Sequence, residues 1–175
     1  MAEQDEKIPT IAEDIIVTKY KMAAEIVNRV LKETVALIKA GASVCETCIN
    51  ADKRIEEETS KAFKKNKNLQ KGIAIPYCIS VNNCICHYSP LNSEPDTVMQ
   101  DGDMVKVDMG AHIDGFTAVV AHTVVISDGN SKVTGRKADA ILAAHLCAEA
   151  ALRLVKPGNE TYTVTDTVQK IAASC

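Results

Sequence analysis

The feature that most constrains the fold is a predicted β-hairpin between residues 103 and 126. Two runs rich in β-branched and apolar residues flank the segment His112-Ile113-Asp114-Gly115. An Asp-Gly pair between two such runs is typical of a two-residue turn, because both positions readily adopt positive φ. We therefore expect an antiparallel sheet, to which an extended run over residues 72–87, interrupted at Pro76, adds a further strand.

Helical patterns surround this hairpin on both sides. Residues 10–13 and 43–46 each read as a capping box, and apolar residues at helical spacing follow both. An alanine-rich stretch before Pro157-Gly158 has the composition of a third helix. The patterns predict an α+β fold with a disordered tail over residues 1–12 and four helices, over residues 10–41, 43–63 and about 134–155, and from about residue 163 onward.

Composition excludes several classes of protein. Charged residues make up 25% of the chain and the net charge is −3, which is ordinary for a globular protein. No run approaches the roughly 18 apolar residues of a membrane span, and the acidic start lacks the apolar stretch of a signal peptide. Seven cysteines without a secretory signal indicate reduced thiols. We expect a protein without membrane insertion, in the cytoplasm or nucleus.

The cysteines leave three alternatives open. Cys45-Glu46-Thr47-Cys48 is a C-x-x-C pattern, and Cys84-Ile85-Cys86-His87 adds three soft metal ligands. A structural zinc site needs four such side chains to converge. We favour unreactive cysteines over zinc or a redox pair, because Cys45 and Cys48 fall inside a capped helix and Cys84 and Cys86 are expected on one face of a strand.

Two basic groups are candidates for an RNA-contacting surface. The first holds five lysines and no acidic residue: Lys61, Lys64, Lys65, Lys67 and Lys71. The second and weaker group is Lys132, Arg136 and Lys137. Clustered cations neutralise phosphates without regard to base sequence, although lysines near a helix C-terminus are also commonly solvated and complement the helix dipole. Aromatic residues are only 3% of the chain, which argues against base stacking.

Several segments carry a family resemblance. They are a strand-like run that ends on His87, a strand that contains Asp108, and the segments 80–84, 134–139 and 143–159, the last reading AAHLCAEAALRLVKPGN. Together they resemble the proliferation-associated, ErbB-binding branch of the methionine aminopeptidase-like superfamily, whose fold is known as pita-bread. The resemblance covers nearly the whole chain and implies that residues 1–175 are the first half of a single pita-bread domain.

The same resemblance implies that the metal site of the related peptidases is incomplete in this chain. The related peptidases hold two cations with five ligands, of which Asp108 matches the first and Val119 stands where the second, another aspartate, is expected. The other three belong to the second half of the domain, beyond residue 175, and His87 matches a histidine that faces substrate. Because valine offers neither charge nor lone pair, we expect no catalytic residue, no metal and no cofactor, only a vestigial pocket at His87, Asp108 and Val119.

The implied function is binding. Members of this branch are non-peptidase proteins linked to ribosomes and growth control. We therefore expect RNA, ribosomal particles, and receptor-linked or transcriptional regulators as partners, roles in ribosome biogenesis and translation, and cytoplasmic and nuclear or nucleolar localisation. The alternatives are a metal-dependent methionine aminopeptidase, or a truncated isoform that sequesters partners of a full-length protein. Half a domain exposes a sheet edge and an apolar face, so we expect the chain alone to self-associate or to need a partner.

Overall fold

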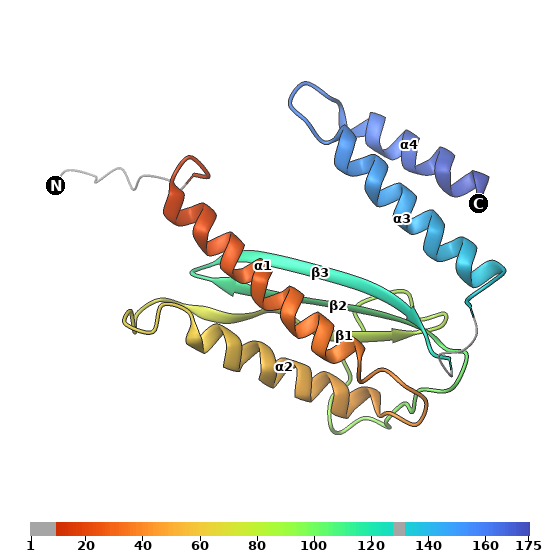
Figure 1. Ribbon diagram of the computed structural model, residues 1–175, viewed down its shortest axis with the longest axis horizontal. Helices are drawn as coiled ribbons and strands as arrows, with labels where there is room; N and C mark the ends of the chain where they lie inside the picture. Colours follow the sequence, from red (N-terminus) through yellow and green to blue (C-terminus); the bar gives the residue numbers. More distant parts are fainter. Residues whose placement is uncertain (1–9, 128–131) are drawn as a thin grey trace. The chain divides into compact units, whose positions relative to one another are not determined.

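Two helices and a three-stranded sheet form one compact unit, and two further helices form another. The computed structural model describes residues 10–127 and 132–175, so most of the expected N-terminal tail lies outside the described residues. The first unit ends at Ser127 and the second begins at Asp128. Figure 1 shows the elements in chain order: α1 (Asp14–Val35), α2 (Val44–Lys61), β1 (Lys71–Val81), β2 (Met104–Ile113), β3 (Phe116–Val125), α3 (Arg136–Leu154) and α4 (Thr161–Ser174).

The predicted hairpin is confirmed as β2 and β3. Asp114 and Gly115 connect the strands with φ values of 57° and 80°, as a turn with positive φ at both central positions requires. The sheet is antiparallel throughout, in the order β1-β2-β3. The expected interruption at Pro76 is wrong, because β1 runs through the proline. Its pairing with β2 is instead irregular between Ile75 and Cys78, which accommodates a residue without an N–H group.

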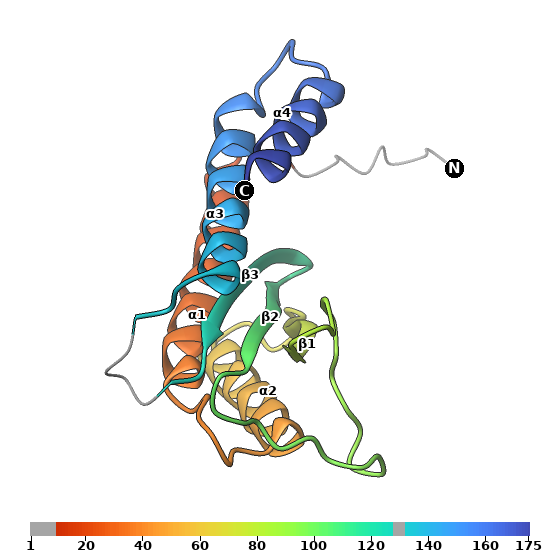
Figure 2. The ribbon, with the colours of Figure 1, turned by 90° about the vertical axis from the view of Figure 1, so that its right-hand side faces the viewer.

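The core lies between one face of the sheet and the helices α1 and α2, which lie side by side on that face (Figure 2). Alternate residues of β2 point into it and are completely buried: Val105, Val107, Met109, Ala111 and Ile113. The helices contribute fully buried apolar side chains such as Val30 and Ile55. The opposite face of the sheet, termed the distal face here, carries Lys106, Asp108 and Gly110, because strand side chains alternate between faces.

The two N-terminal capping predictions had different outcomes. Ser43 does cap α2, since its Oγ accepts a hydrogen bond from the N–H of Glu46 at 2.9 Å. Thr10 does not cap α1, because its hydroxyl accepts from Ala12 in a local turn and the helix begins only at Asp14. The predicted helix ends also extend too far: α1 stops at Val35 and α2 at Lys61.

The second unit is a pair of helices, α3 and α4, whose predicted positions are correct to within about two residues. A glycine with positive φ, Gly135 at 64°, precedes α3. The Sγ of Cys147 on α3 donates to the carbonyl of Val168 on α4 at 3.7 Å. Within the described ranges, no helix is long and apolar enough to cross a membrane.

Candidate functional site

The hairpin register places Asp108 and Val119 on the same face of the sheet. Asp108 lies opposite Ala121 and Gly110 lies opposite Val119, so the two residues are diagonal neighbours on the distal face. Val119 is 63% exposed, whereas the Asp108 side chain is only 16% exposed. The residues directly opposite and diagonal to Asp108 on β3 therefore supply no carboxylate.

His87 reaches Asp108 from the loop that follows β1. Its Nδ1 lies 2.9 Å from one carboxylate oxygen of Asp108, and its backbone N–H donates to the other at 3.4 Å. The loop returns alongside β1, because the N–H of Ile79 donates to the carbonyl of Tyr88 at 2.8 Å and the N–H of Tyr88 donates to Ser80 Oγ at 3.3 Å. The carboxylate of Asp108 is thus in hydrogen-bonding contact with both the ring and the backbone of His87.

Lys106 lies on the same face as Asp108, and its Nζ donates to the carbonyl of Asn82 at 2.5 Å. One sequence-based expectation for this region is wrong. Cys84 and Cys86 do not lie in a strand, because β1 ends at Val81 and the chain turns at Asn82, whose φ is 51°. The turn folds residues 84–90 back toward β1, and this reversal brings His87 to the carboxylate.

A third residue, Cys78, completes this group. It is the cross-strand partner of Asp108 and is 3% exposed, with its Sγ 3.2 Å from the carbonyl of Pro76. Burial, and then the negative charge of Asp108, raise the pKa of the Cys78 thiol to about 12. Sequence reasoning missed Cys78, because only the irregular register of β1 reveals that it lies opposite Asp108.

The other cysteines lie outside this group of three convergent ligand atoms. Cys45 and Cys48 are buried in α2, and burial raises the pKa of the Cys48 thiol to about 12, as is typical of an unreactive buried thiol. Cys84 is partly buried and Cys86 exposed. Among residues 10–127 and 132–175, the group formed by Cys78, His87 and Asp108 is the one place where three potential ligand atoms converge.

By themselves, these three residues are too few to hold a dinuclear peptidase centre. Two cations about 3.5–4 Å apart require several carboxylates to offset their repulsion and to activate a shared water. Around Asp108 the described chain provides one carboxylate, one imidazole and one thiol. Val119 occupies the diagonal position without a ligand atom, and no step of peptide hydrolysis can be derived from this arrangement.

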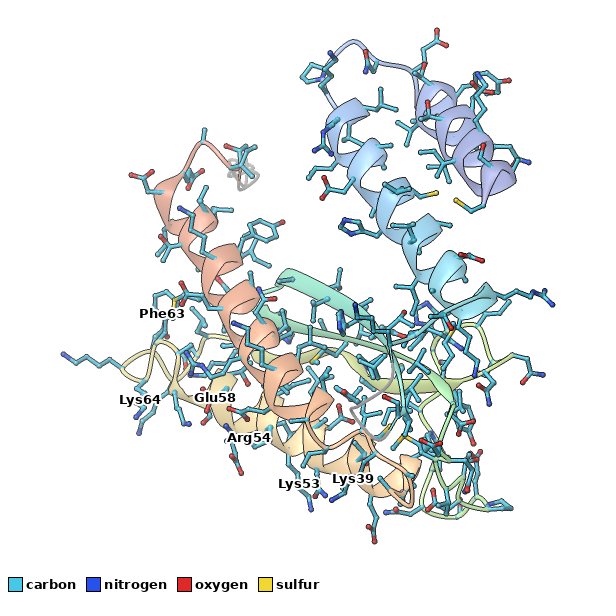
Figure 3. All side chains as sticks on the ribbon, turned by 45° about the vertical axis from the view of Figure 1, so that its right-hand side comes forward. Lys39, Lys53, Arg54, Glu58, Phe63 and Lys64 are labelled. Atoms are coloured by element: carbon cyan, nitrogen blue, oxygen red, sulfur yellow. The ribbon has the colours of Figure 1, made fainter. Side chains whose placement is uncertain are left out.

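The lysines of the first basic group differ in whether their ammonium groups contact other residues. Lys64, Lys65 and Lys67 are exposed and follow the end of α2, where Figure 3 labels Phe63 and Lys64. Lys61 contacts Glu58 at 2.5 Å. Lys71 donates to the carbonyl of Ala62, and also to that of Ser60 at 3.1 Å, so it satisfies the C-terminal end of α2. Of the five lysines, Lys64, Lys65 and Lys67 are thus the ones without such a contact in the described part of the chain.

The second basic group begins the second unit. Lys132, Arg136 and Lys137 are all exposed, and Arg136 and Lys137 form the first residues of α3. Residues 128–131, which precede Lys132, lie outside the described residues. Cations in the first turn of a helix oppose its dipole, so the dipole of α3 does not favour this group.

Comparison with known proteins gives the family. Residues 18–175 match metallopeptidase family M24. The chain belongs to this family, and its two helices and antiparallel sheet, followed by two further helices, are the N-terminal part of the pita-bread fold. The resemblance drawn from the sequence segments is confirmed.

Several relatives are similar over nearly the whole chain. ERBB-3 BINDING PROTEIN 1 of Arabidopsis thaliana is 48% identical over 173 residues, which are 98% of this chain and 43% of that protein. Proliferation-associated protein A of Dictyostelium discoideum is 45% identical over 95% of this chain and 44% of its own length. Curved DNA-binding protein of Schizosaccharomyces pombe is 43% identical over 90% of this chain and 41% of its own length. The chain thus spans less than half the length of these relatives.

Solved structures show the same fold. A thermophilic Arx1 superposes with a TM-score of 0.80 at 29% identity, over 93% of this chain and 49% of that one. The X-Pro aminopeptidase of Thermotoga maritima superposes with a TM-score of 0.73 at 20% identity, over 93% of this chain and 42% of that one. The second likeness concerns the fold alone.

Proposed function

We propose that this chain is part of a non-catalytic member of family M24 that acts by binding. Its ligands are RNA, ribosomal particles and protein partners, in ribosome biogenesis, translation and growth control, in the cytoplasm and the nucleus. The observation that carries the proposal is Val119, which is exposed on the distal face beside Asp108. The resemblance to the peptidases places a second aspartate at this position, and valine offers no ligand atom.

The three free lysines supply the binding chemistry. Lys64, Lys65 and Lys67 lie within four residues of one another and are all exposed, so their ammonium groups are available to phosphates. The segment contains no acidic residue to neutralise them. The names of two relatives refer to binding, one to ErbB-3 and one to curved DNA, and the name of a third refers to proliferation.

Replacing Lys64, Lys65 and Lys67 by glutamine is the direct test. We expect weaker RNA binding by about the same factor for different sequences, because phosphate contacts carry no base information. The logarithmic salt slope should shrink by up to about 0.7 for each lost contact with single-stranded RNA. Filter binding across a salt series measures both quantities, and circular dichroism should show an unchanged fold.

A matched control removes the same charge elsewhere. Lys32, Lys39 and Lys53 are also exposed, and their triple glutamine variant should retain the wild-type salt slope. Figure 3 labels Lys39 and Lys53. Lys71→Gln should reduce stability without changing the slope, because this ammonium contacts backbone carbonyls. Equal losses of RNA affinity in the two triple variants would show that net charge is the cause. An unchanged salt slope in the variant of Lys64, Lys65 and Lys67 would make Lys132, Arg136 and Lys137 the next candidates for the RNA surface.

The competing function is metal-dependent aminopeptidase activity, which the description of the family as metallopeptidases favours. We expect neither the wild-type chain nor Val119→Asp to hydrolyse a Met-initiated peptide with added Mn²⁺, Co²⁺, Fe²⁺ or Zn²⁺. The new carboxylate would give Asp108 a neighbour, but two carboxylates are too few ligands for two cations. Val119→Asn, which has the same size without the charge, is the control. Turnover by either the wild type or Val119→Asp would refute the non-catalytic proposal.

A further inference from the structure

Three different ligand types converge on one point of the first unit. Cys78 Sγ, His87 Nδ1 and a carboxylate oxygen of Asp108 all lie within 4.8 Å of one another. They come from β1, from the loop after β1 and from β2, so the sheet register and the loop reversal together create the group. The His87 and Asp108 atoms are already 2.9 Å apart.

We propose that Cys78, His87 and Asp108 bind a single zinc ion, with a solvent molecule as the fourth ligand. Thiolate, imidazole and carboxylate are the three side-chain donors that zinc accepts. Bonds of about 2.0–2.3 Å place neighbouring ligand atoms of a tetrahedral zinc site roughly 3.3–3.7 Å apart. The ligand atoms here all lie within 4.8 Å of one another, so the group has the size that such a site requires. A mixed sulfur, nitrogen and oxygen set disfavours Mg²⁺ and Ca²⁺, which prefer oxygen alone.

The loop holds His87 close to the position that the ion requires. His87 has a φ of 60°, a conformation that non-glycine residues rarely adopt, and its own N–H is directed at Asp108. The bonds of Ile79 and Tyr88 fix the loop against β1. Only small movements of side chains are then needed to bring the three ligands to zinc distances.

Burial and exposure divide the site into a closed and an open side. Cys78 is 3% exposed, and the Asp108 side chain 16%, but the His87 side chain is 69% exposed. An ion therefore has access from the His87 side, where the fourth position is left to solvent. A coordinated thiol loses its proton to the solvent, since the cation outweighs the burial that keeps the free thiol protonated.

This site differs from a dinuclear peptidase centre in the number of metal ions and in the side chains that bind them. It holds one ion rather than two, and it uses a thiol in place of the second carboxylate. The expectation of no bound metal was based on the incomplete dinuclear site and on the four thiols of Cys45, Cys48, Cys84 and Cys86. Cys78 was not among the ligands that it took into account. The zinc proposal replaces that expectation and does not depend on RNA binding.

The test uses the chain of 175 residues with zinc and cobalt as probes. After incubation with zinc and gel filtration, elemental analysis should find about one equivalent of zinc. Cobalt should give the intense thiolate-to-metal absorption that only a sulfur ligand produces. Cys78→Ser should abolish that absorption and weaken zinc binding roughly tenfold or more, since even the partners of metal ligands contribute that much.

Two further variants keep the outcome interpretable. His87→Ala alters an exposed residue, so it should weaken zinc binding while leaving the circular dichroism unchanged, even if Cys78→Ser fails to fold. Cys84→Ser removes a neighbouring thiol outside the group and should bind like the wild type. The lysine variant described above should also bind zinc normally. Zinc binding that is absent, or that is equal in the wild type and His87→Ala, would overturn the proposal.

Discussion

Replacing Tyr77 by alanine is expected to lower the free energy of unfolding by about 3–5 kcal/mol, because it empties a large site in the core. Tyr77 is completely buried on β1. Its hydroxyl donates to Thr34 Oγ1 on α1 at 2.9 Å, and its backbone N–H donates to Asp52 on α2 at 2.7 Å. Urea unfolding followed by circular dichroism measures the change.

The matched variant Tyr77→Phe separates packing from hydrogen bonding. It keeps the ring and removes only the hydroxyl, so we expect a loss of about 0.5–1.5 kcal/mol. The Thr34 hydroxyl stays satisfied, since it still donates to the carbonyl of Val30 at 2.8 Å. Equal losses in Tyr77→Ala and Tyr77→Phe would contradict the assignment of most of the energy to packing. Because Cys78 is the next residue, Tyr77→Ala should also weaken zinc binding.

Replacing Glu58 by glutamine is expected to lower the free energy of unfolding by about 1.5–3 kcal/mol at neutral pH, the range for hydrogen bonds to a charged group. The Glu58 side chain is only 4% exposed and contacts Lys61 and Arg29, each at 2.5 Å, and Arg54 at 3.3 Å. Figure 3 labels Arg54 and Glu58 on α2. The carboxylate joins α1 to the last turns of α2.

The effect of Glu58 should depend on pH with a definite sign. The hydrogen bond from Lys61, the charge of Lys61 and the contact with Arg29 lower the pKa of Glu58 below its ordinary value of 4.5. The stabilisation is therefore complete above that value and is lost as the pH falls through the lower, folded-state pKa. Urea unfolding of wild type and Glu58→Gln at neutral and acidic pH should show converging stabilities.

Glu57→Gln provides the comparison for this experiment. Glu57 is 58% exposed and contacts Arg54 at 2.5 Å, so its ion pair is screened by solvent. We expect its replacement to change the free energy of unfolding by less than about 1 kcal/mol. A difference between wild type and Glu58→Gln that stayed constant down to acidic pH would show that the charge of Glu58 is not the cause.

The sequence alone was sufficient for features that depend on periodicity. The alternation of β2 and β3 and the Asp-Gly turn determine the hairpin register, and with it the shared face of Asp108 and Val119. The helix cap at Ser43 was also predictable, because its signal lies within four residues. These predictions use only neighbours along the chain or across a two-residue turn.

The candidate zinc site could not be predicted in the same way. Continued without interruption from the pair Ile73–Ala111, the register would place Cys78 opposite Lys106. The irregularities before and after Ile75 shift the pairing by two residues and set Cys78 against Asp108. No sequence pattern gives the size of such a shift, because it depends on how the sheet accommodates Pro76.

The lysines illustrate a second limit. Lys64, Lys65, Lys67 and Lys71 look equivalent in the sequence, yet only Lys71 returns to the end of α2 and donates to Ala62 and Ser60. This contact depends on the turn at Phe63, which has a φ of 44°. A residue of that type rarely adopts positive φ, so sequence reasoning had no basis for the turn.

The attachment of the hairpin tip has a consequence for the order of folding. Asp114 forms an ion pair with Lys19, which lies 95 residues earlier in the chain, and its N–H donates to the carbonyl of Gln70 at 2.6 Å. The turn itself is local and can close within microseconds, but both attachments require the closure of long loops. The helix pair α3 and α4 joins neighbours in sequence and has no such requirement. The first unit therefore has the higher contact order, and we expect it to assemble more slowly than the helix pair.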